Sequence, residues 1–484
     1  MAKSYKTPGV YIEEIKSLPA SIAQVETAIP AFIGYTEKAT DQETGDLKGI
    51  PKRIRSLLEF NQYFGAAKPE TSITVDVDNT QGTINNNPTI KVSQPNSREP
   101  FLMHYGLHMF YANGGGPCYI VSVGRYGENL DAQDAQVTSI INADDFLFGL
   151  NEIKKIDEPT LLVFPDATAL HSDNDFYALY TIALQQCNDL KDRFTIIDTR
   201  SYDAANTVDS NIDSLRTILT SDTNLLKYGA AYYPFLETIL DYVYDETQTE
   251  VTILTEDETG MISSNSITLD AIENSDIALY NSIKVEISQL PVILPPSATI
   301  AGIYARTDRD RGVWKAPANV SLSYVIRPTV AISDEDQKDL NVDVIAGKSI
   351  NAIRSFTGKG NLVWGARTLA GNDNEWRYIP VRRLFNMVEE SIKKGTMHAV
   401  FEPNDANTWV KVKAMIENYL IKLWRDGALA GARPEHAFYV KLGLGETMTA
   451  QDILDGNMII EVGMAPLRPA EFIILRISHK MQET

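Results

Sequence analysis

The chain has 484 residues, 44% of them hydrophobic and 22% charged, which is typical of a globular protein and excludes a fibrous or disordered one. Its 44 basic and 64 acidic residues give a net charge of −20, which argues against nucleic acid and an anionic membrane surface as partners. The length favours about three domains, and two cysteines cannot form a disulfide framework.

The N-terminus has no apolar segment of the kind found in secretory signals. No run of about 18 apolar residues could span a bilayer. We therefore expect a protein that is assembled in the cytoplasm, has no signal peptide and does not insert directly into a membrane.

Residues 1–25 predict a linking arm and not a domain. Val10–Ile15 alternates apolar and polar residues in the manner of a strand, but no partner strand lies nearby in the sequence. Since a lone strand cannot satisfy its own backbone groups, it has to pair with something distant. The candidate linking residues are Val10, Tyr11, Ile12, Glu13 and Ile15.

Residues 26–344 alternate apolar strands with helices, which predicts an α/β body with a largely parallel sheet. The expected strands are Ala28–Tyr35, Cys118–Val123, Leu161–Phe164 and Phe194–Asp198, and the expected helices include 101–112, 143–154, 174–188 and 298–307. Two stretches, 71–98 and 241–291, interrupt the alternation and are interpreted as β-rich excursions. The second has 11 acidic residues, and Lys284 is its only base.

Residues 345–470 predict an α+β core domain, with helices at Arg382–Lys394 and Trp409–Arg425 and strands at Ala437–Leu442 and Met458–Val462. Residues 345–484 carry 18 basic and 15 acidic residues, whereas residues 1–344 carry 26 and 49. The nearly neutral C-terminal third is therefore the better place to look for packed interfaces.

The last expected strand, Phe472–Ile477, belongs to a C-terminal arm of residues 471–484. It is apolar on both faces, as a strand buried in a sheet between subunits would be. Its candidate contact residues are Phe472, Ile474 and Arg476.

No motif supports catalysis, a metal or a nucleotide. Gly347–Ser349 ends like a phosphate-binding loop, but Val342 stands where that motif needs a glycine. His104 and His108 have the i,i+4 spacing of zinc ligands without the glutamate of a metalloprotease helix. We therefore expect no enzyme activity and no cofactor.

Several long strings remain that neither core packing nor a motif explains. They are TPGVYIEE (7–14), TAIPAFIGYT (27–36), GVWKAPAN (312–319), EWRYIPVRRLF (375–385), VFEPN (400–404) and APLRPAEF (465–472). In this order they resemble the contractile tail sheath family, found in myophage tails, tailocins and extracellular contractile injection systems. The resemblance runs from residue 7 to about 478 and is interrupted by 71–98 and 241–290.

The resemblance implies a structural homo-oligomer: a six-fold helical sheath around an inner tube protein, with baseplate and terminal cap proteins as further partners. It implies that the sheath contracts and drives the tube through a target envelope, in a particle that is released or anchored to the cell. Family arms complete the sheets of neighbouring subunits by strand exchange.

The resemblance also places a helix of the C-terminal domain against the tube. In this sequence that helix is Arg382–Lys394, and its polar stripe of Arg383, Asn386, Glu390, Lys393 and Lys394 is expected to face outward. Two alternatives stay open, a different tail or baseplate component and a soluble α/β enzyme.

Overall fold

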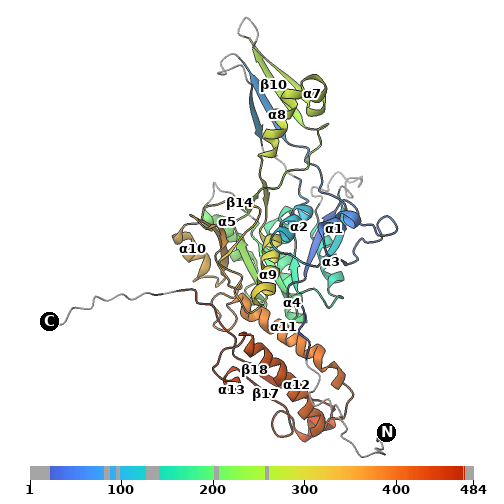
Figure 1. The fold of residues 1–484 in the computed structure, drawn as a ribbon, viewed down its shortest axis with the longest axis vertical. Helices are drawn as coiled ribbons and strands as arrows, with labels where there is room; N and C mark the ends of the chain where they lie inside the picture. The colour runs from blue at the N-terminus through green and yellow to red at the C-terminus, as the bar shows by residue number, and fades with distance from the viewer. Residues whose placement is uncertain are drawn as a thin grey trace, which may run out of the picture. The chain divides into compact units, whose positions relative to one another are not determined.

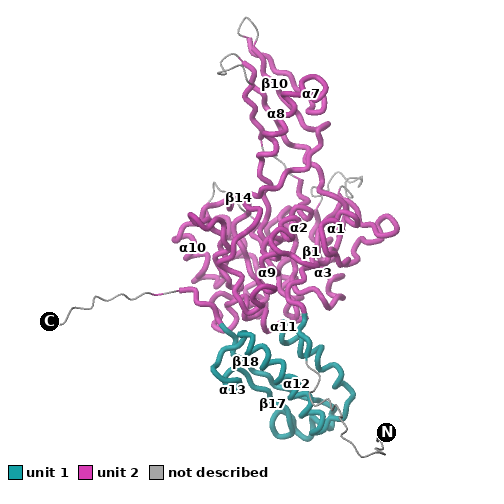
Figure 2. Tube along the Cα trace, viewed as in Figure 1, with its two compact units in different colours: residues 1–25, 387–467 teal, residues 26–386, 468–484 magenta. Residues whose placement is uncertain are grey.

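The computed structural model describes residues 22–80, 88–93, 99–126, 141–200, 207–256, 261–472 and 474. The chain divides into two compact units (Figure 2): unit 1 is Met1–Val25 and Met387–Leu467, and unit 2 is Glu26–Asn386 and Arg468–Thr484. The boundary falls inside the helix α11 (Ile379–Thr396). The expected boundary at 344/345 lies elsewhere because residues 345–386 contribute two strands to the main sheet of unit 2.

A nine-stranded sheet in the order β13-β16-β15-β8-β7-β6-β1-β5-β2 organises unit 2 (Figure 1). From β5 to β15 neighbouring strands are parallel, whereas β2, β16 and β13 are antiparallel to their neighbours. The bounds are β1 (Pro30–Thr36), β2 (Lys52–Ile54), β5 (Cys118–Arg125), β6 (Leu161–Val163), β7 (Phe194–Asp198), β8 (Gly229–Tyr233), β13 (Val320–Ser321), β15 (Ile350–Phe356) and β16 (Gly360–Val363). The predicted α/β body is confirmed.

Helices cover both faces of this sheet, because successive residues of a buried strand point to opposite sides. Ile33 and Ile197 belong to a core that includes residues of α3 and α4. Phe32 and Ile196 belong to a second core, with residues of α2 and α9. The helices are α1 (Leu57–Phe64), α2 (Met103–Ala112), α3 (Ala143–Ile153), α4 (Asp173–Leu190), α5 (Val208–Ile218), α6 (Thr223–Leu226), α9 (Ser297–Arg311) and α10 (Asp334–Asn341).

Two buried carboxylates near the C-terminal ends of parallel strands cap helices. Asp166, just beyond β6, accepts the backbone N–H groups of Leu102 (2.6 Å) and Met103 (2.9 Å) at the start of α2. Asp198, the last residue of β7, accepts the N–H (2.9 Å) and the hydroxyl (2.5 Å) of Ser297 at the start of α9. Burial raises the pKa of both carboxyl groups to about 7.

The two excursions pair with each other. The strands β3 (Thr74–Asn79), β4 (Thr89–Ser93), β10 (Glu250–Glu256) and β11 (Ile262–Thr268) form a sheet in the order β11-β10-β3-β4. The second excursion also contains α7 (Leu269–Ser275) and α8 (Ile277–Ser288), which the β-rich interpretation missed. Ile283 of α8 packs with Val75 and Val251 in a further core that also includes Tyr105 and Met109 of α2. A third sheet joins β12 (Val292–Leu294), β9 (Leu236–Thr238) and β14 (Val325–Pro328).

Unit 1 combines the C-terminal half of α11 with α12 (Ala406–Arg425), α13 (Pro434–Ala437), α14 (Ala450–Leu454) and the strands β17 (Phe438–Lys441) and β18 (Glu461–Met464). Asp405 caps α12 by accepting the backbone N–H of Thr408 (2.9 Å), and α12 lies beside β17. Both predicted helices are present here, and both predicted strands are present with shifted bounds. Among the described helices, none is both long and apolar enough to cross a bilayer.

Candidate subunit interface

The beginning of the described chain docks on α11 within unit 1. The backbone N–H of Val25 donates to Ser391 Oγ (3.1 Å), and Ile22 is only 6% exposed. Gly395 provides the space for Ile22, because a Cβ at this position would lie 2.7 Å from Ile22 Cγ1. The predicted linking residues Val10, Tyr11, Ile12, Glu13 and Ile15 lie outside the described residues. What the structure provides is therefore the root of the N-terminal arm.

β17 and β18 form an antiparallel ribbon that pairs with no further strand in the described part of the chain. Val440 is buried, whereas Tyr439, on the opposite face of the ribbon, is 48% exposed. A ribbon of two strands is marginally stable by itself, and an unpaired strand edge is a template for another strand. The ribbon therefore offers an unpaired strand edge to which an incoming arm can hydrogen-bond.

Glu471 ties the root of the C-terminal arm to unit 2. Its carboxylate accepts two hydrogen bonds from Arg367, from Nε at 2.8 Å and from Nη2 at 2.5 Å. Arg367 Nη1 also donates to the carbonyl oxygen of Asn341 at 3.1 Å. Because a bidentate pair fixes both direction and distance, the arm starts from a defined point beside the end of α10.

The two residues described beyond Glu471 are not covered by the rest of unit 2. Phe472 and Ile474 are 71% and 78% exposed and belong to no strand. The strand expected at Phe472–Ile477 is therefore not formed at these two residues within the single chain, and Arg476 lies outside the described residues. Two exposed apolar side chains at the start of an arm remain available for a partner.

Three residues of the predicted outward stripe on α11 are buried. The guanidinium of Arg383 pairs with Asp308 at 3.0 and 2.5 Å, Asn386 donates to the carbonyl oxygen of Arg193, and Glu390 is 6% exposed. For these three residues the prediction is wrong. The apolar stripe identifies one buried side of a helix, but it does not exclude a second side covered by partners that satisfy polar groups.

Lys393 and Lys394 are the two stripe residues whose side chains are exposed, at 60% and 40%. Both ammonium groups lie 3.1 Å from the carboxylate of Glu390. Glu390 therefore pairs with Lys393 at i,i+3 and with Lys394 at i,i+4. The exposed positive charge of the stripe is confined to its C-terminal end.

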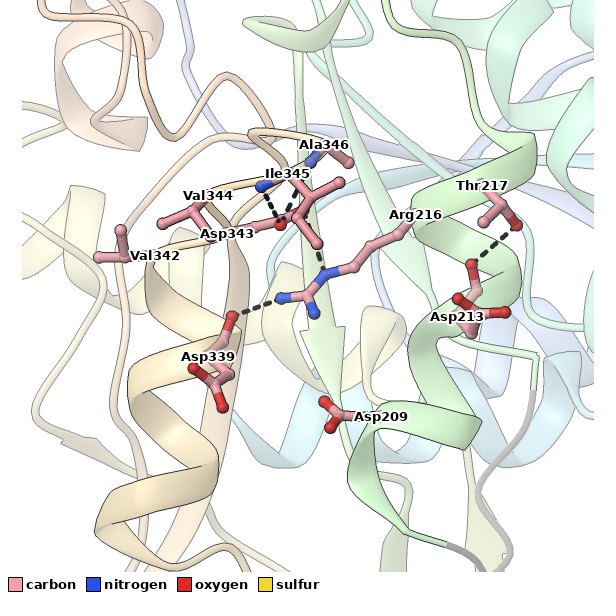
Figure 3. A pocket seen from close by; sticks show the side chains of 10 residues that line it. All are labelled: Asp209, Asp213, Arg216, Thr217, Asp339, Val342, Asp343, Val344, Ile345 and Ala346. Carbon is pink, nitrogen blue, oxygen red and sulfur yellow. Dashed lines mark hydrogen bonds and ion pairs between the residues drawn. The ribbon is translucent and has the colours of Figure 1, made fainter.

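A pocket of about 360 Å³ lies in unit 2 between α5, α10 and the turn that follows α10 (Figure 3). Arg216 spans it, with Nε 3.3 Å from Asp343 Oδ2 and Nη2 donating to the carbonyl oxygen of Asp339. The lining residues are Asp209, Asp213, Arg216, Thr217, Asp339, Val342, Asp343, Val344, Ile345 and Ala346. The hydroxyl of Thr217 donates to the backbone carbonyl oxygens of Asp213 and Ser214, so the acidic and aliphatic lining fits binding better than catalysis.

The motif residues considered for catalysis serve the fold. Lys348 is buried and donates to the carbonyl oxygens of Arg216 (2.7 Å) and Leu219 (2.5 Å). Burial lowers the pKa of His104 to about 4, which keeps the ring neutral. Burial raises the pKa of the Cys118 thiol to about 12. Within the described ranges, no group of three or more His, Cys, Asp or Glu side chains could hold a metal ion.

Sequence reasoning missed the two arm roots and the pocket. Glu471 falls inside a string that carries the resemblance, so it was a recognisable candidate, but its partner Arg367 lies 104 residues away. Gly395 gave no signal, because a glycine near the end of a helix is unremarkable. The pocket combines segments more than 100 residues apart, and nothing in either segment marks it.

Several known proteins resemble this chain. Residues 371–480 match the phage tail sheath C-terminal domain family. A tail sheath protein of Vibrio phage KVP40 is 25% identical over 183 residues, which are 38% of this chain and 26% of that protein. The chain thus aligns with about a quarter of this curated relative.

Two solved structures resemble the chain over almost all of its length. The helical sheath of the anti-feeding prophage in its contracted state is 31% identical, with a TM-score of 0.62 over 99% of this chain and 100% of that one. The sheath complex of PVC, an extracellular contractile injection system, also in a contracted state, is 30% identical, with a TM-score of 0.63 over 99% of both chains.

Proposed function

This chain belongs to the contractile tail sheath family, and we propose that it polymerises as a six-fold helical sheath around an inner tube and contracts to drive that tube through a target envelope. The proposal is carried by the likeness, over 99% of the chain, to two sheaths described in the contracted state. The chain is a structural protein and not an enzyme. Baseplate and terminal cap proteins are its further proposed partners, in a phage tail or a phage-tail-like particle.

Polymerisation is tested by negative-stain microscopy of the purified protein, alone and with an inner tube protein. The sheath proposal requires long hollow tubes. A single small oligomer at every concentration would contradict it and favour the alternative of another tail or baseplate component.

We further propose that subunits are linked by strand exchange. The N-terminal arm would pair with the β17–β18 ribbon of a neighbouring subunit, together with the C-terminal arm. Main-chain hydrogen bonds hold such an added strand, and side-chain pockets select it. Two open ribbon edges and two anchored arm roots support this arrangement. A head-to-tail exchange that does not close on itself generates a helix.

Contact with the inner tube is proposed for the end of α11, now limited to Lys393 and Lys394. Reversing these two charges alone would leave the buried Glu390 without a cationic partner. The informative variant therefore reverses all three charges: Glu390→Lys, Lys393→Glu and Lys394→Glu. This variant keeps the internal pairs and reverses the exposed charge. It should remain folded and lose co-assembly with tubes; unchanged co-assembly would contradict the placement.

The acidic excursion 241–291 is proposed to lie on the outside of the sheath. With 11 acidic residues and one base, it would repel a like copy if packed against it. On a solvated surface the same charge favours solubility.

A further inference from the structure

We infer that the pocket between α5 and α10 holds the end of the C-terminal segment of the same chain, residues 475–480, before subunits assemble. The inference rests on the proposed function, in which this segment later pairs with a neighbouring subunit. It assigns to the free subunit a resting place for an arm that would otherwise present apolar side chains to water.

The rim of the pocket is apolar and exposed. Val344 and Ile345 are 85% and 94% exposed, and Val342 is 42% exposed. The turn that carries them is nevertheless firmly held, because the Asp343 carboxylate accepts the backbone N–H groups of Ile345 (3.0 Å) and Ala346 (3.2 Å). An ordered turn that exposes three aliphatic side chains is suited to cover an apolar segment.

The charge of the pocket selects a basic occupant. Its lining has four aspartates and one arginine, a net charge of −3. Asp209, Asp213 and Asp339 are exposed, and their carboxylates form no ion pair or hydrogen bond among the described residues. Arg216 cannot balance them, since its guanidinium is engaged by Asp343 and by a backbone carbonyl. The three carboxylates therefore leave the surface of the pocket negatively charged.

The C-terminal segment has the matching chemistry. Residues 475–480 offer the apolar Leu475 and Ile477 and the basic Arg476 and Lys480, with no acidic residue before Glu483. The apolar residues suit the rim of Val342, Val344 and Ile345, and the two bases suit the free carboxylates. Phe472 and Ile474, which precede this segment, are largely exposed and belong to its tether.

The root of the arm lies next to the pocket. Arg367 bonds both to Glu471, where the arm begins, and to Asn341, the residue immediately before the rim at Val342. Arg476 is five residues beyond Glu471, so an extended chain can carry it up to about 17 Å. A short tether gives an effective concentration in the millimolar range, so weak contacts suffice to hold the segment, and a neighbouring subunit can displace it.

The test uses the full chain at a concentration where it is unassembled. The variant Asp209→Asn/Asp213→Asn/Asp339→Asn removes the charge of the pocket at three exposed positions. We expect amide exchange in residues 475–480 and tryptic cleavage after Arg476 to become at least threefold faster. The matched control, Glu43→Gln/Glu250→Gln/Glu273→Gln, removes three exposed charges elsewhere and should leave both rates unchanged. Equal rates in the pocket variant and the native chain would overturn the inference.

A charge exchange tests the pairing between the bases of the segment and the carboxylates of the pocket. Arg476→Glu/Lys480→Glu should also free the segment, by amide exchange, and adding Asp209→Lys/Asp339→Lys should restore its protection. Protection that disappears on dilution would show that a second copy occupies the pocket, which contradicts docking within one chain. These measurements concern the free subunit. If the segment is freed as expected but no version of the protein forms tubes, the proposed function fails and the docking inference stands.

Discussion

Arg383 and Asp308 form a buried ion pair between α11 and α9, with side-chain exposures of 3% and 6%. Asp308 also accepts the hydroxyl of Thr27 at 2.6 Å, and Arg383 donates to the carbonyl oxygen of Thr27 at 2.9 Å. Three segments distant in the sequence therefore meet in one charged cluster. Breaking one partner of such a pair leaves an uncompensated buried charge, which is more costly than losing the contact itself.

Arg383→Ala should therefore lower the free energy of unfolding by about 3–5 kcal/mol. Lys411→Ala, on an exposed position of α12, is the control and should change it by less than about 1 kcal/mol. Urea denaturation followed by circular dichroism measures both. Similar small effects for the two variants would mean that Arg383 is not buried against Asp308.

The buried carboxyl group of Asp198 sets the direction in which the stability of the protein changes with pH. Burial raises the pKa of its carboxyl group to about 7 in the folded protein, against about 3.9 in an unfolded chain. Between these values the folded state binds the proton more tightly, so the stability from this group is complete below about pH 4 and is lost as the pH rises through 7. Asp166 acts in the same direction, since burial raises its pKa likewise.

We expect Asp198→Asn to reduce the loss of stability between pH 5.5 and pH 8. The asparagine can still accept the Ser297 N–H and can donate to its hydroxyl, while it does not titrate. Glu273→Gln, at an exposed carboxyl group outside the pocket, is the control and should not reduce this loss. Melting temperatures measured at pH 5.5 and pH 8 test this prediction. If Asp198→Asn does not change the difference between the two melting temperatures, the raised pKa is contradicted.

At the residue scale, the sequence predicted which side of α11 is apolar but not which polar residues are buried. Arg383 and Asp308 are 75 residues apart, and no local pattern links them. A charged side chain looks exposed in a sequence until its partner is known. Lys393 and Lys394 pair with a residue of their own helix, so the local sequence pattern was enough to place them on the surface.

The docking of the arm root on α11 leads to a prediction at the scale of elements. Gly395→Ala would ordinarily stabilise a helix interior by up to about 1 kcal/mol. Here the added methyl group meets Ile22, with Cβ 2.7 Å from Cγ1, so the substitution should displace the root and bring no gain. Combined with Ile22→Ala, which removes the obstructing atoms, the helix benefit should reappear.

Thermal denaturation of the two single variants and the double variant forms the test cycle. Strong coupling between the two positions supports docking of Ile22 at Gly395. Additive effects would mean that the root does not lie there.

The shared sheet of the two excursions alters what a deletion should do. β10 pairs in parallel with β3, and Val75 and Val77 of β3 are fully buried. Deleting 241–291 alone would expose this face, so we expect a destabilised, aggregating subunit. Replacing only residues 257–260 by Asn-Gly keeps every pair from Glu250 to Thr268 and should be tolerated. Light scattering during heating distinguishes the variants, and a soluble, stable 241–291 deletion would contradict the shared core.

At this scale, local periodicity predicted the central strands and their flanking helices, because each is a buried segment with a clear repeat. It could not predict that β3 and β10, whose paired residues are 176 positions apart, share a sheet. It also misread α7 and α8, whose serine and β-branched content resembles a strand. The domain boundary was misplaced because β15 and β16, which follow α10 in the sequence, extend the same sheet that contains β1.

At the scale of the whole molecule, the structural class follows from the family resemblance and not from physical patterns in the sequence. The six strings between residues 7 and 472 carry that resemblance, and the likeness to known sheaths over 99% of the chain agrees with it. Subunit linking depends on contacts that a single chain does not make. An arm whose partner is another copy looks, in the sequence, like a strand without a sheet.

Subunit linking is tested most directly by negative-stain microscopy of the chain lacking Ala2–Ile15, with thermal melting of the same sample. We expect a folded, soluble subunit with native melting that forms no long sheaths, because the root at Ile22–Val25 is kept while the linking strand is gone. Ile12→Pro, which removes one main-chain donor, and Ile12→Asp, which keeps it, should both block polymerisation. Long sheaths from the deleted chain, or a subunit that no longer folds, would contradict linking between subunits.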